Sequence, residues 1–331
     1  MENNKKFAVI GGGSWATAIA KMLCENQEKI AWYMRSTYAL EHLKHQKHNP
    51  NYLSSVAFDT DKLQLTNDIN EAIKFADILI FAIPSAFLSG ELEKMTESLE
   101  GKTIFSAIKG IVPETSLIVG EHFHSKFNIP YENIGVITGP CHAEEVALER
   151  LSYLTIACSD KVKAKYLAKN VSSYYIKTKT SDDIVGTEYA AVLKNIYSIA
   201  AGIAHGLGYG DNFQAVLMSN AIREMKKFIK KVHRMKRNIN DSAYLGDLLV
   251  TGYSVFSRNR MFGNMIGKGY TVKSAQMEMS MIAEGYYAVK SAYNLNLEYK
   301  AKTPIVDAVY QILYEGKDAK AVFAKLTDKL D

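Results

Sequence analysis

Near its start the chain carries the segment Phe7-Ala8-Val9-Ile10-Gly11-Gly12-Gly13-Ser14-Trp15-Ala16-Thr17-Ala18-Ile19-Ala20, which is the most informative part of the sequence for the fold. The four apolar residues predict a buried strand, the glycines a tight turn, and the alanine-rich end a helix. This order favours a dinucleotide site: Gly11 allows the turn, and Gly13 lets a pyrophosphate approach the helix N-terminus. Ala16 stands at the third glycine position, where helix packs on strand. A plain strand-to-helix turn without a ligand is the alternative.

Further apolar segments along the first half predict alternating strands and helices. Beyond residues 7–10, we expect strands at residues 29–34, 78–83, 103–107, 134–137, 154–157 and 174–176. Such alternation is typical of an α/β fold with a doubly wound parallel sheet. Ligands bind where the carboxyl ends of parallel strands meet. We expect that edge to carry residues 11–15, 35–36, 84–85, 109–110 and 139–140.

From about Ser181 the pattern changes to long helices with few strand signals. We expect helices at residues 184–203, 211–232, 245–256, 274–292 and 304–314. The Lys-rich residues 160–179 are expected to form a solvated edge of the preceding domain. With 331 residues, the chain is long enough for two domains. We therefore expect a dinucleotide-binding domain at residues 1–180 and a mostly α-helical substrate and catalytic domain at residues 181–331.

Composition narrows the class of protein. The net charge of +5 comes without a basic stripe that has interleaved aromatic residues, so we expect no nucleic-acid partner. Three scattered cysteines, Cys24, Cys141 and Cys158, predict a reducing compartment rather than a disulfide framework. The start of the chain leads directly into a strand without a signal peptide, and no apolar run is long enough to span a bilayer. We expect a cytoplasmic protein without stable membrane insertion.

Lys194 is the first catalytic candidate. In a helix over residues 184–203, it lies opposite the apolar stripe. Its own face carries small or polar residues: Thr187, Ala191, Ser198, Ala201 and His205. Solvated faces normally carry Glu, Lys and Gln, so a small-residue face around one lysine favours space for a ligand. An ordinary surface lysine packed beside small residues is the alternative.

The second candidate cluster lies in residues 246–260. If this segment is helical, Asp247, Thr251, Ser254 and Arg258 are spaced i, i+4, i+7 and i+11 and share one face. A carboxylate, two hydroxyls and a guanidinium suit a polyhydroxylated phosphate, because arginine binds phosphate oxygens bidentately. A salt-bridged, solvent-exposed face is the alternative.

Short segments in family order across about residues 7–285 resemble NAD(P)-dependent glycerol-3-phosphate dehydrogenases of the bacterial type. They are Gly11-Gly12-Gly13-Ser14-Trp15-Ala16-Thr17-Ala18, Ala82-Ile83-Pro84-Ser85, Ile108-Lys109-Gly110, Thr138-Gly139-Pro140-Cys141-His142-Ala143-Glu144-Glu145-Val146, Leu193-Lys194-Asn195, Gly208-Tyr209-Gly210-Asp211-Asn212, Gly246-Asp247-Leu248, Ser257-Arg258-Asn259 and Ala283-Glu284-Gly285. The resemblance implies a Rossmann domain joined to a helical domain, with the active site in the cleft between them.

The resemblance also implies roles. Lys194 would protonate the carbonyl oxygen of dihydroxyacetone phosphate as hydride arrives, giving sn-glycerol 3-phosphate, a phospholipid precursor, and would act as base in reverse. Asp247 would hold Lys194 and favour its charged form, and Lys109 would reach both cofactor and substrate. Further substrate-binding residues are Gly139, Cys141, Thr251, Ser257, Arg258 and Asn259, with the phosphate on Arg258 and Asn259. The cofactor-binding residues are Gly11, Gly13, Ser14, Trp15, Arg35, Lys109, Ala143, Arg258, Ile282 and Glu284.

The choice between NADH and NADPH depends on the residues after the second strand. A carboxylate about 20 residues past the glycines would bind the ribose 2′-OH of NADH, but the first one after the strand is Glu41. Arg35 and Ser36 could instead meet a 2′-phosphate. We expect NADPH to be accepted and preferred, with NADH also usable. Arg35 stacked on the adenine, which would suit either cofactor, is the alternative.

The sequence also departs from the family pattern at some positions and contains motifs that compete with this interpretation. Cys141 stands where the family usually has Ser or Thr, and Tyr33-Met34-Arg35 where it often shows Trp-x-Arg. A nucleophilic Cys141 is not favoured, because its neighbour His142 is close only in sequence. The histidines of residues 42–48 are interleaved with lysines that would repel a cation, so we expect no metal site.

Two other functions compete with the dehydrogenase. One is a two-domain dehydrogenase acting on a 3-hydroxy acid or sugar acid, which would not need the Ser257-Arg258-Asn259 segment. The other is a non-catalytic NADP(H)-sensing protein, which would not need Lys194 together with Asp247. The expected partner is a small molecule, and a homodimer is kept as a candidate assembly.

Overall fold

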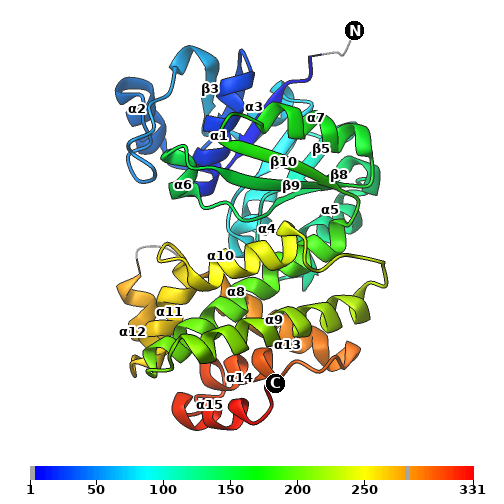
Figure 1. Cartoon of the computed structure of the whole chain (residues 1–331). Helices are drawn as coiled ribbons and strands as arrows, with labels where there is room; N and C mark the ends of the chain where they lie inside the picture. Colours follow the sequence, from blue (N-terminus) through cyan, green and yellow to red (C-terminus); the bar gives the residue numbers. More distant parts are fainter. Residues whose placement is uncertain (1–3, 280–282) are drawn as a thin grey trace. The chain divides into compact units, whose positions relative to one another are not determined.

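The computed structural model describes residues 4–279 and 283–331 (Figure 1). The chain divides into two compact units. One comprises Met1–Ile108 and Leu117–Ile184, and the other comprises Lys109–Ser116 and Val185–Asp331. The short segment Lys109–Ser116 therefore belongs with the helical second half, although strands flank it in the sequence.

The first unit is built on an eight-stranded sheet with the order β10-β9-β8-β5-β4-β1-β2-β3. Its strands are β1 (Phe7–Ile10), β2 (Ile30–Tyr33), β3 (Leu63–Thr66), β4 (Ile78–Phe81), β5 (Thr103–Ser106), β8 (Ile134–Thr138), β9 (Ser152–Cys158) and β10 (Ile176–Ser181). Neighbouring strands are parallel except β8 and β9, which are antiparallel. The expected α/β fold is confirmed, with a sheet that is mainly rather than entirely parallel.

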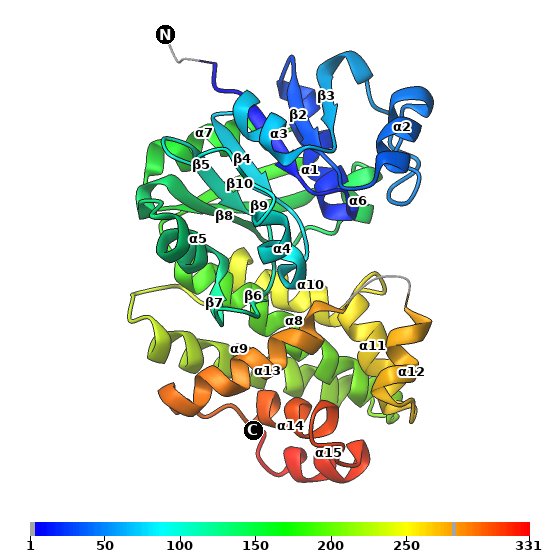
Figure 2. The same cartoon turned by 180° about the vertical axis from the view of Figure 1, so that it is seen from behind.

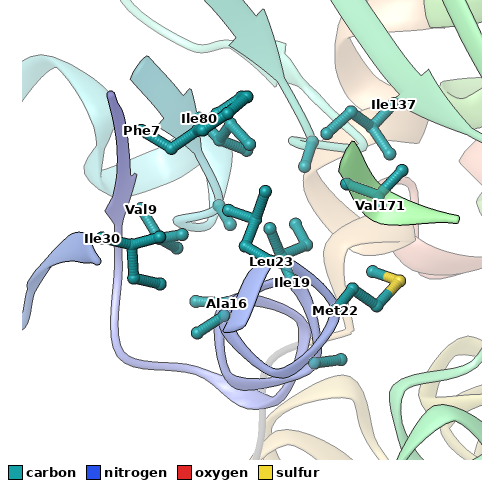
Figure 3. Close-up of a cluster of buried hydrophobic side chains, with 14 of the residues drawn as sticks. Phe7, Val9, Ala16, Ile19, Met22, Leu23, Ile30, Ile80, Ile137 and Val171 are labelled. Atoms are coloured by element: carbon teal, nitrogen blue, oxygen red, sulfur yellow. The ribbon is translucent and has the colours of Figure 1, made fainter. Parts of the chain in front are cut away.

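Helices cover both faces of this sheet (Figures 1 and 2). Helices α1 (Ser14–Asn26) and α7 (Lys161–Val171) pack on one face, and α3 (Ile69–Phe75) and α5 (Val119–Phe127) on the other. Figure 3 shows the core beneath α1, where Ile19 and Leu23 meet the strand residues Val9 and Ile80. The first unit also contains α2 (Thr37–Gln46), α4 (Leu88–Leu92), β7 (Leu117–Ile118) and α6 (Ala143–Ala147), whereas β6 (Ile111–Val112) lies in the short segment that belongs to the second unit.

Two expectations for the end of this half are wrong. The strand expected at residues 174–176 begins only at Ile176, because its alternating pattern lies in the following residues. Residues 160–179 are not simply a solvated edge. Asp160 caps α7 by accepting hydrogen bonds from Val162 and Lys163, and the helix buries Leu167 and Val171 in the core.

The second unit is mostly helical, as expected. Its helices are α8 (Ile184–Gly206), α9 (Asp211–Val232), α10 (Asp247–Tyr253), α11 (Arg258–Gly267), α12 (Val272–Glu278), α13 (Glu284–Tyr299), α14 (Pro304–Leu313) and α15 (Ala319–Thr327). The helix expected at residues 211–232 is confirmed. The single helix expected at residues 274–292 is wrong, since α12 ends at Glu278 and α13 begins at Glu284.

Glycines let α8 and α11 approach each other at backbone distance. A Cβ added at Gly263 would lie 2.1 Å from the Ile199 carbonyl oxygen, and one added at Gly202 would lie 2.1 Å from the Arg260 carbonyl oxygen. Both are far below van der Waals contact, so neither position has room for a side chain. This close packing fixes the start of α11, which carries Arg258 and Asn259, against the helix that carries Lys194.

Candidate active site

The glycine turn after β1 has the backbone geometry that its sequence predicts. Gly11 has φ +135°, and a Cβ there would lie 2.4 Å from the Ala82 carbonyl oxygen at the end of β4. Gly13 caps α1 without a side-chain hydrogen bond, and a Cβ there would meet nothing within 4 Å among the described residues. The N-cap residue therefore offers no side chain to the N–H groups of the first helical turn. An open helix N-terminus of this kind fits a pyrophosphate.

Two residues outside the predicted site hold this turn. The Trp32 indole donates a 2.7 Å hydrogen bond to the Gly11 carbonyl oxygen. The buried Asn49 amide donates to the Gly12 carbonyl oxygen at 3.1 Å and to the Thr17 hydroxyl at 3.0 Å. Sequence analysis missed Asn49 because it lies far along the chain, in a segment interpreted only through its histidines.

The end of β8 brings three predicted residues to the same edge of the sheet. Gly139 has φ +115°, and a Cβ there would lie 2.7 Å from the Tyr153 carbonyl oxygen. Cys141 is buried, and Ala143 begins α6, which packs beside α1. The turn therefore requires glycine, and α6 places Ala143 in the neighbourhood of the helix that starts at Ser14 and Trp15.

Arg35 follows β2 and is 71% exposed at its side chain. Its guanidinium lies 6.0 Å from the ring centroid of Phe87. The hydroxyl oxygen of Ser36 accepts a hydrogen bond from Ala39 and caps α2. The structure thus places an exposed cation directly after β2, at the edge of the sheet where ligands bind in doubly wound folds.

Lys194 and Asp247 form a buried ion pair within the helical unit. The Lys194 side chain on α8 is 4% exposed, and its ammonium donates a hydrogen bond to Oδ1 of Asp247, whose side chain is 2% exposed. Oδ2 of Asp247 is buried without a hydrogen-bond partner among the described residues. The interpretation of Lys194 as a surface lysine is therefore wrong, and a carboxylate oxygen beside it is left to accept a further hydrogen bond.

Desolvation dominates the electrostatics of this lysine. Burial lowers the pKa of Lys194 to about 8, with Lys109 acting in the same direction and Asp247 acting against both. Asp247 thus stabilises the ammonium without restoring the ordinary lysine pKa near 10.4. A lysine in this range exchanges a proton readily near neutral pH, as acid or base.

The backbone of Lys109 is held against α8 by the residue that follows Lys194. The Asn195 amide donates a 3.0 Å hydrogen bond to the Lys109 carbonyl oxygen and so ties the segment after β5 to α8. Asn195 is 5% exposed. Its position directly after Lys194 is the signal in the sequence that could have indicated this contact.

Ser257, Arg258 and Asn259 form the start of α11. The Ser257 hydroxyl oxygen accepts a hydrogen bond from the Arg260 N–H and lies 2.8 Å from the Ser198 hydroxyl. Asn259 Oδ1 accepts from the Gly285 N–H at 2.9 Å, which orients the amide, whose NH₂ group is a donor. The Ser257 side chain is therefore engaged in capping, whereas the Asn259 amide retains a donor group.

Two parts of the predicted polar face need correction. Asp247, Thr251, Ser254 and Arg258 do not share one helix, because α10 ends at Tyr253 and Ser257 starts a new one. The face of α8 around Lys194 is also partly filled. The Ser198 hydroxyl donates to the Thr251 carbonyl oxygen at 2.8 Å, and the Thr251 hydroxyl donates to the Asp247 carbonyl oxygen at 2.7 Å. Small residues there serve helix packing as well as the site.

Glu284 adds a second carboxylate to the cationic group. Burial raises its pKa, while Arg258, Lys109 and Lys194 pull it downward. Its Oε2 is buried without a hydrogen-bond partner in the described parts of the chain. Ile282, also predicted to bind cofactor, lies outside the described residues. The helical unit therefore gathers the three cations Lys109, Lys194 and Arg258 with the two carboxylates Asp247 and Glu284.

Neither a metal cluster nor a membrane span is present in the described residues. Within residues 4–279 and 283–331, no group of three His, Cys, Asp or Glu side chains could hold a metal ion. In the same ranges, no helix is both long and apolar enough to cross a bilayer. The histidines of residues 42–48 lie at α2 and its end, where the His42 and His48 rings pack edge to face.

Comparison with known proteins places both halves in one family. Residues 6–164 match the sequence model described as NAD-dependent glycerol-3-phosphate dehydrogenase N-terminus, and residues 183–324 match its C-terminus counterpart. A glycerol-3-phosphate dehydrogenase [NAD(P)+] of Limosilactobacillus reuteri (strain DSM 20016) is 33% identical over 98% of this chain and 97% of its own length. One of Bacillus pumilus (strain SAFR-032) is 33% identical over 95% and 91%.

Solved structures agree with the sequence comparison. The crystal structure of glycerol-3-phosphate dehydrogenase from Coxiella burnetii superposes with a TM-score of 0.90 at 25% identity, covering 98% of both chains. A Plasmodium falciparum glycerol-3-phosphate dehydrogenase at 22% identity shares the fold with a TM-score of 0.87, over 97% of this chain and 94% of its own. The resemblance stated from the sequence is confirmed. The chain belongs to the NAD-dependent glycerol-3-phosphate dehydrogenase family, oxidoreductases that act on CH–OH donors with NAD(P) as cofactor.

Proposed function

We propose that this chain reduces dihydroxyacetone phosphate to sn-glycerol 3-phosphate and catalyses the reverse oxidation, with Lys194 as the proton donor and acceptor. The observation that carries the proposal is the buried Lys194–Asp247 pair, in which the ammonium has a pKa of about 8. The family relationship supports the reaction class. The cations and the amide at the start of α11 support a phosphorylated substrate.

Reduction of the carbonyl group requires one proton from the protein. When bound, NAD(P)H supplies the hydride that forms the new C–H bond at the substrate carbonyl carbon. The carbonyl π electrons then move onto the oxygen, which takes a proton from Nζ of Lys194 and leaves a neutral amine. Until that transfer, the ammonium also stabilises the negative charge that develops on this oxygen. In oxidation the neutral amine removes the hydroxyl proton.

Asp247 holds the lysine for this step. Its Oδ1 accepts from the ammonium, and its second oxygen is buried without a partner among the described residues. We infer that Oδ2 accepts a hydrogen bond from a substrate hydroxyl, because an unpaired buried carboxylate oxygen is costly to leave unsatisfied. Asp247 therefore orients both the acid and the substrate.

The phosphate is assigned to Arg258 and Asn259. A guanidinium binds two phosphate oxygens in a fixed plane, and the Asn259 amide is oriented by the Gly285 N–H so that its NH₂ group can donate. Lys109 adds a second positive charge, and Ser257 fixes the start of α11. We place Gly139, Cys141 and Thr251 among the substrate contacts through backbone or hydroxyl groups.

The cofactor is assigned to the sheet edge of the first unit. The first turn of α1, with Gly11, Gly13, Ser14 and Trp15, would take the pyrophosphate, and Arg35 would lie at the adenosine end. Ala143, Ile282 and Glu284 complete the proposed set. We further propose a cytoplasmic enzyme that supplies a phospholipid precursor, in line with its free cysteines. A homodimer is the assembly to test by sedimentation velocity.

Substitution of Lys194 tests the proposal. K194A should lower kcat for dihydroxyacetone phosphate reduction by about 10²–10⁴-fold while leaving the Kd for NADPH close to wild type. The exposed Lys226 on α9 offers a matched control, K226A. Circular dichroism checks that the variant is folded, and added methylammonium should restore part of the rate. If folded K194A keeps more than about a tenth of wild-type kcat, Lys194 is not the proton donor.

A further inference from the structure

A buried carboxylate lies beside the cation at the adenosine end of the proposed cofactor site. Glu91 on the short helix α4 is 5% exposed. Its Oε1 lies 2.9 Å from the ammonium of Lys94 and 3.9 Å from Nη1 of Arg35. After β2 the sequence has no carboxylate until Glu41, and the fold instead places Glu91, from a distant part of the sequence, beside Arg35.

Tyr33 connects this carboxylate to the sheet. Its hydroxyl, at the end of β2, donates a hydrogen bond to Oε2 of Glu91. Burial and this hydrogen bond raise the pKa of Tyr33, so the phenol stays a donor. The tyrosine in the Tyr33-Met34-Arg35 segment, where the family often has Trp-x-Arg, thus has a partner that an indole in its place would contact differently.

The contacts indicate that Glu91 acts through its charge on Arg35 and does not itself contact a bound cofactor. Its side chain is only 7% exposed, so a ribose has little access to its oxygens. Arg35 is 71% exposed and lies beyond hydrogen-bond distance of Glu91, so the guanidinium is free to turn toward a ligand. The carboxylate, which also contacts Lys94, still lowers the positive potential at Arg35, because it lies 3.9 Å from Nη1 and is itself buried away from water.

We propose that Glu91 sets the cofactor selectivity of this chain by offsetting the charge of Arg35, which weakens the hold on a 2′-phosphate and keeps NADH usable beside NADPH. The inference rests on the proposed function and deepens its cofactor site. Glu91 is a positioning residue that acts through Arg35. A 2′-hydroxyl carries no charge, so its binding is nearly insensitive to Glu91, whereas a 2′-phosphate depends on the net charge that Arg35 offers.

The test uses probes of the adenosine end alone. Isothermal titration calorimetry compares 2′,5′-ADP with 5′-AMP on wild type, E91Q, R35A and the double variant. Glutamine keeps an acceptor for Tyr33 and removes the charge. E91Q should bind 2′,5′-ADP about five- to tenfold more tightly, with 5′-AMP changed less than about twofold. The gain should shrink in about 0.5 M salt, and it should fall below about twofold in the R35A background.

Two controls separate charge from structure. E93Q removes a neighbouring exposed carboxylate at the end of α4 and should leave the ratio of the two probes unchanged. Y33F removes the hydrogen bond to Glu91 but keeps its charge, so it should also leave the ratio near wild type. Steady-state kcat/KM for NADPH relative to NADH should rise in E91Q by the same factor as the binding ratio.

Each contrary result has a distinct meaning. An unchanged ratio in E91Q, a gain equal for both probes, or a full gain without Arg35 would overturn the role of Glu91 while leaving the cofactor site intact. A Y33F ratio that follows E91Q would show that Glu91 acts structurally, which also overturns the inference. Failure of wild type to bind either probe would overturn the proposed cofactor site, and this inference with it.

Discussion

The pH dependence of D247N tests the central electrostatic claim about Lys194. In wild type, reduction needs the ammonium, so kcat/KM for dihydroxyacetone phosphate should be level below pH about 8 and fall above it. Oxidation needs the neutral amine, so its kcat/KM should rise with pH and level off above pH about 8. The falling limb of the reduction profile and the rising limb of the oxidation profile therefore both report the proton on Nζ of Lys194.

Removing the carboxylate charge should move both limbs to lower pH. Burial and Lys109 lower the pKa of Lys194, and Asp247 opposes them, so D247N leaves the lowering effects without this counterweight. Loss of an adjacent opposite charge moves a pKa by roughly 1–3 units. For a shift of about 1.5 units, the protonated fraction at about pH 7.5 falls from about 0.76 to about 0.09, an approximately eightfold loss in reduction.

The assay is a set of initial rates in both directions from about pH 5.5 to 10, at constant ionic strength. D328N, which removes an exposed carboxylate of the same unit, should leave both limbs in place. Kd for NADPH measured across the same pH range separates binding from proton transfer. A limb that stays put in D247N, or moves to higher pH, would refute the assignment of the pKa to Lys194.

The remaining predictions concern the phosphate site and the packing of the helical unit. R258K should raise KM for dihydroxyacetone phosphate about tenfold or more while changing the Kd for NADPH less, because an ammonium cannot bind phosphate bidentately; equal effects on both would contradict it. G263A should cost about 1–3 kcal/mol in urea unfolding, since its Cβ would meet the α8 backbone, whereas G90A, with open space, should be neutral or stabilising. E224A should lose about 2 kcal/mol in the same assay, because the Glu224 carboxylate accepts the first N–H groups of α14; K226A on the same helix should change little.

Features that depend on neighbours in the chain could be predicted from the residues alone. The strand, glycine turn and helix around Gly11 follow from local sterics and periodicity, and the structure places them as predicted. The 22-residue helix α9 was equally readable, because its apolar spacing is long and uninterrupted. The prediction that Asp247 and Arg258 share one helix face was wrong, because periodicity does not show where one helix ends and a second, serine-capped helix begins.

Which charged side chains contact one another depends on how distant segments pack together. Lys194 and Asp247 are 53 positions apart, and Tyr33 and Glu91 are 58 positions apart, yet each pair shares a hydrogen bond in a buried place. The antiparallel pairing of β9 with β8 is likewise set by packing across the sheet. The pKa of Lys194 depends on its desolvation and on contacts with residues distant in the sequence, and the carboxylate beside Arg35 also comes from a distant segment. Residue types identify candidate ionisable groups, but only the fold determines how deeply these groups are buried and which charges lie within a few ångströms of them.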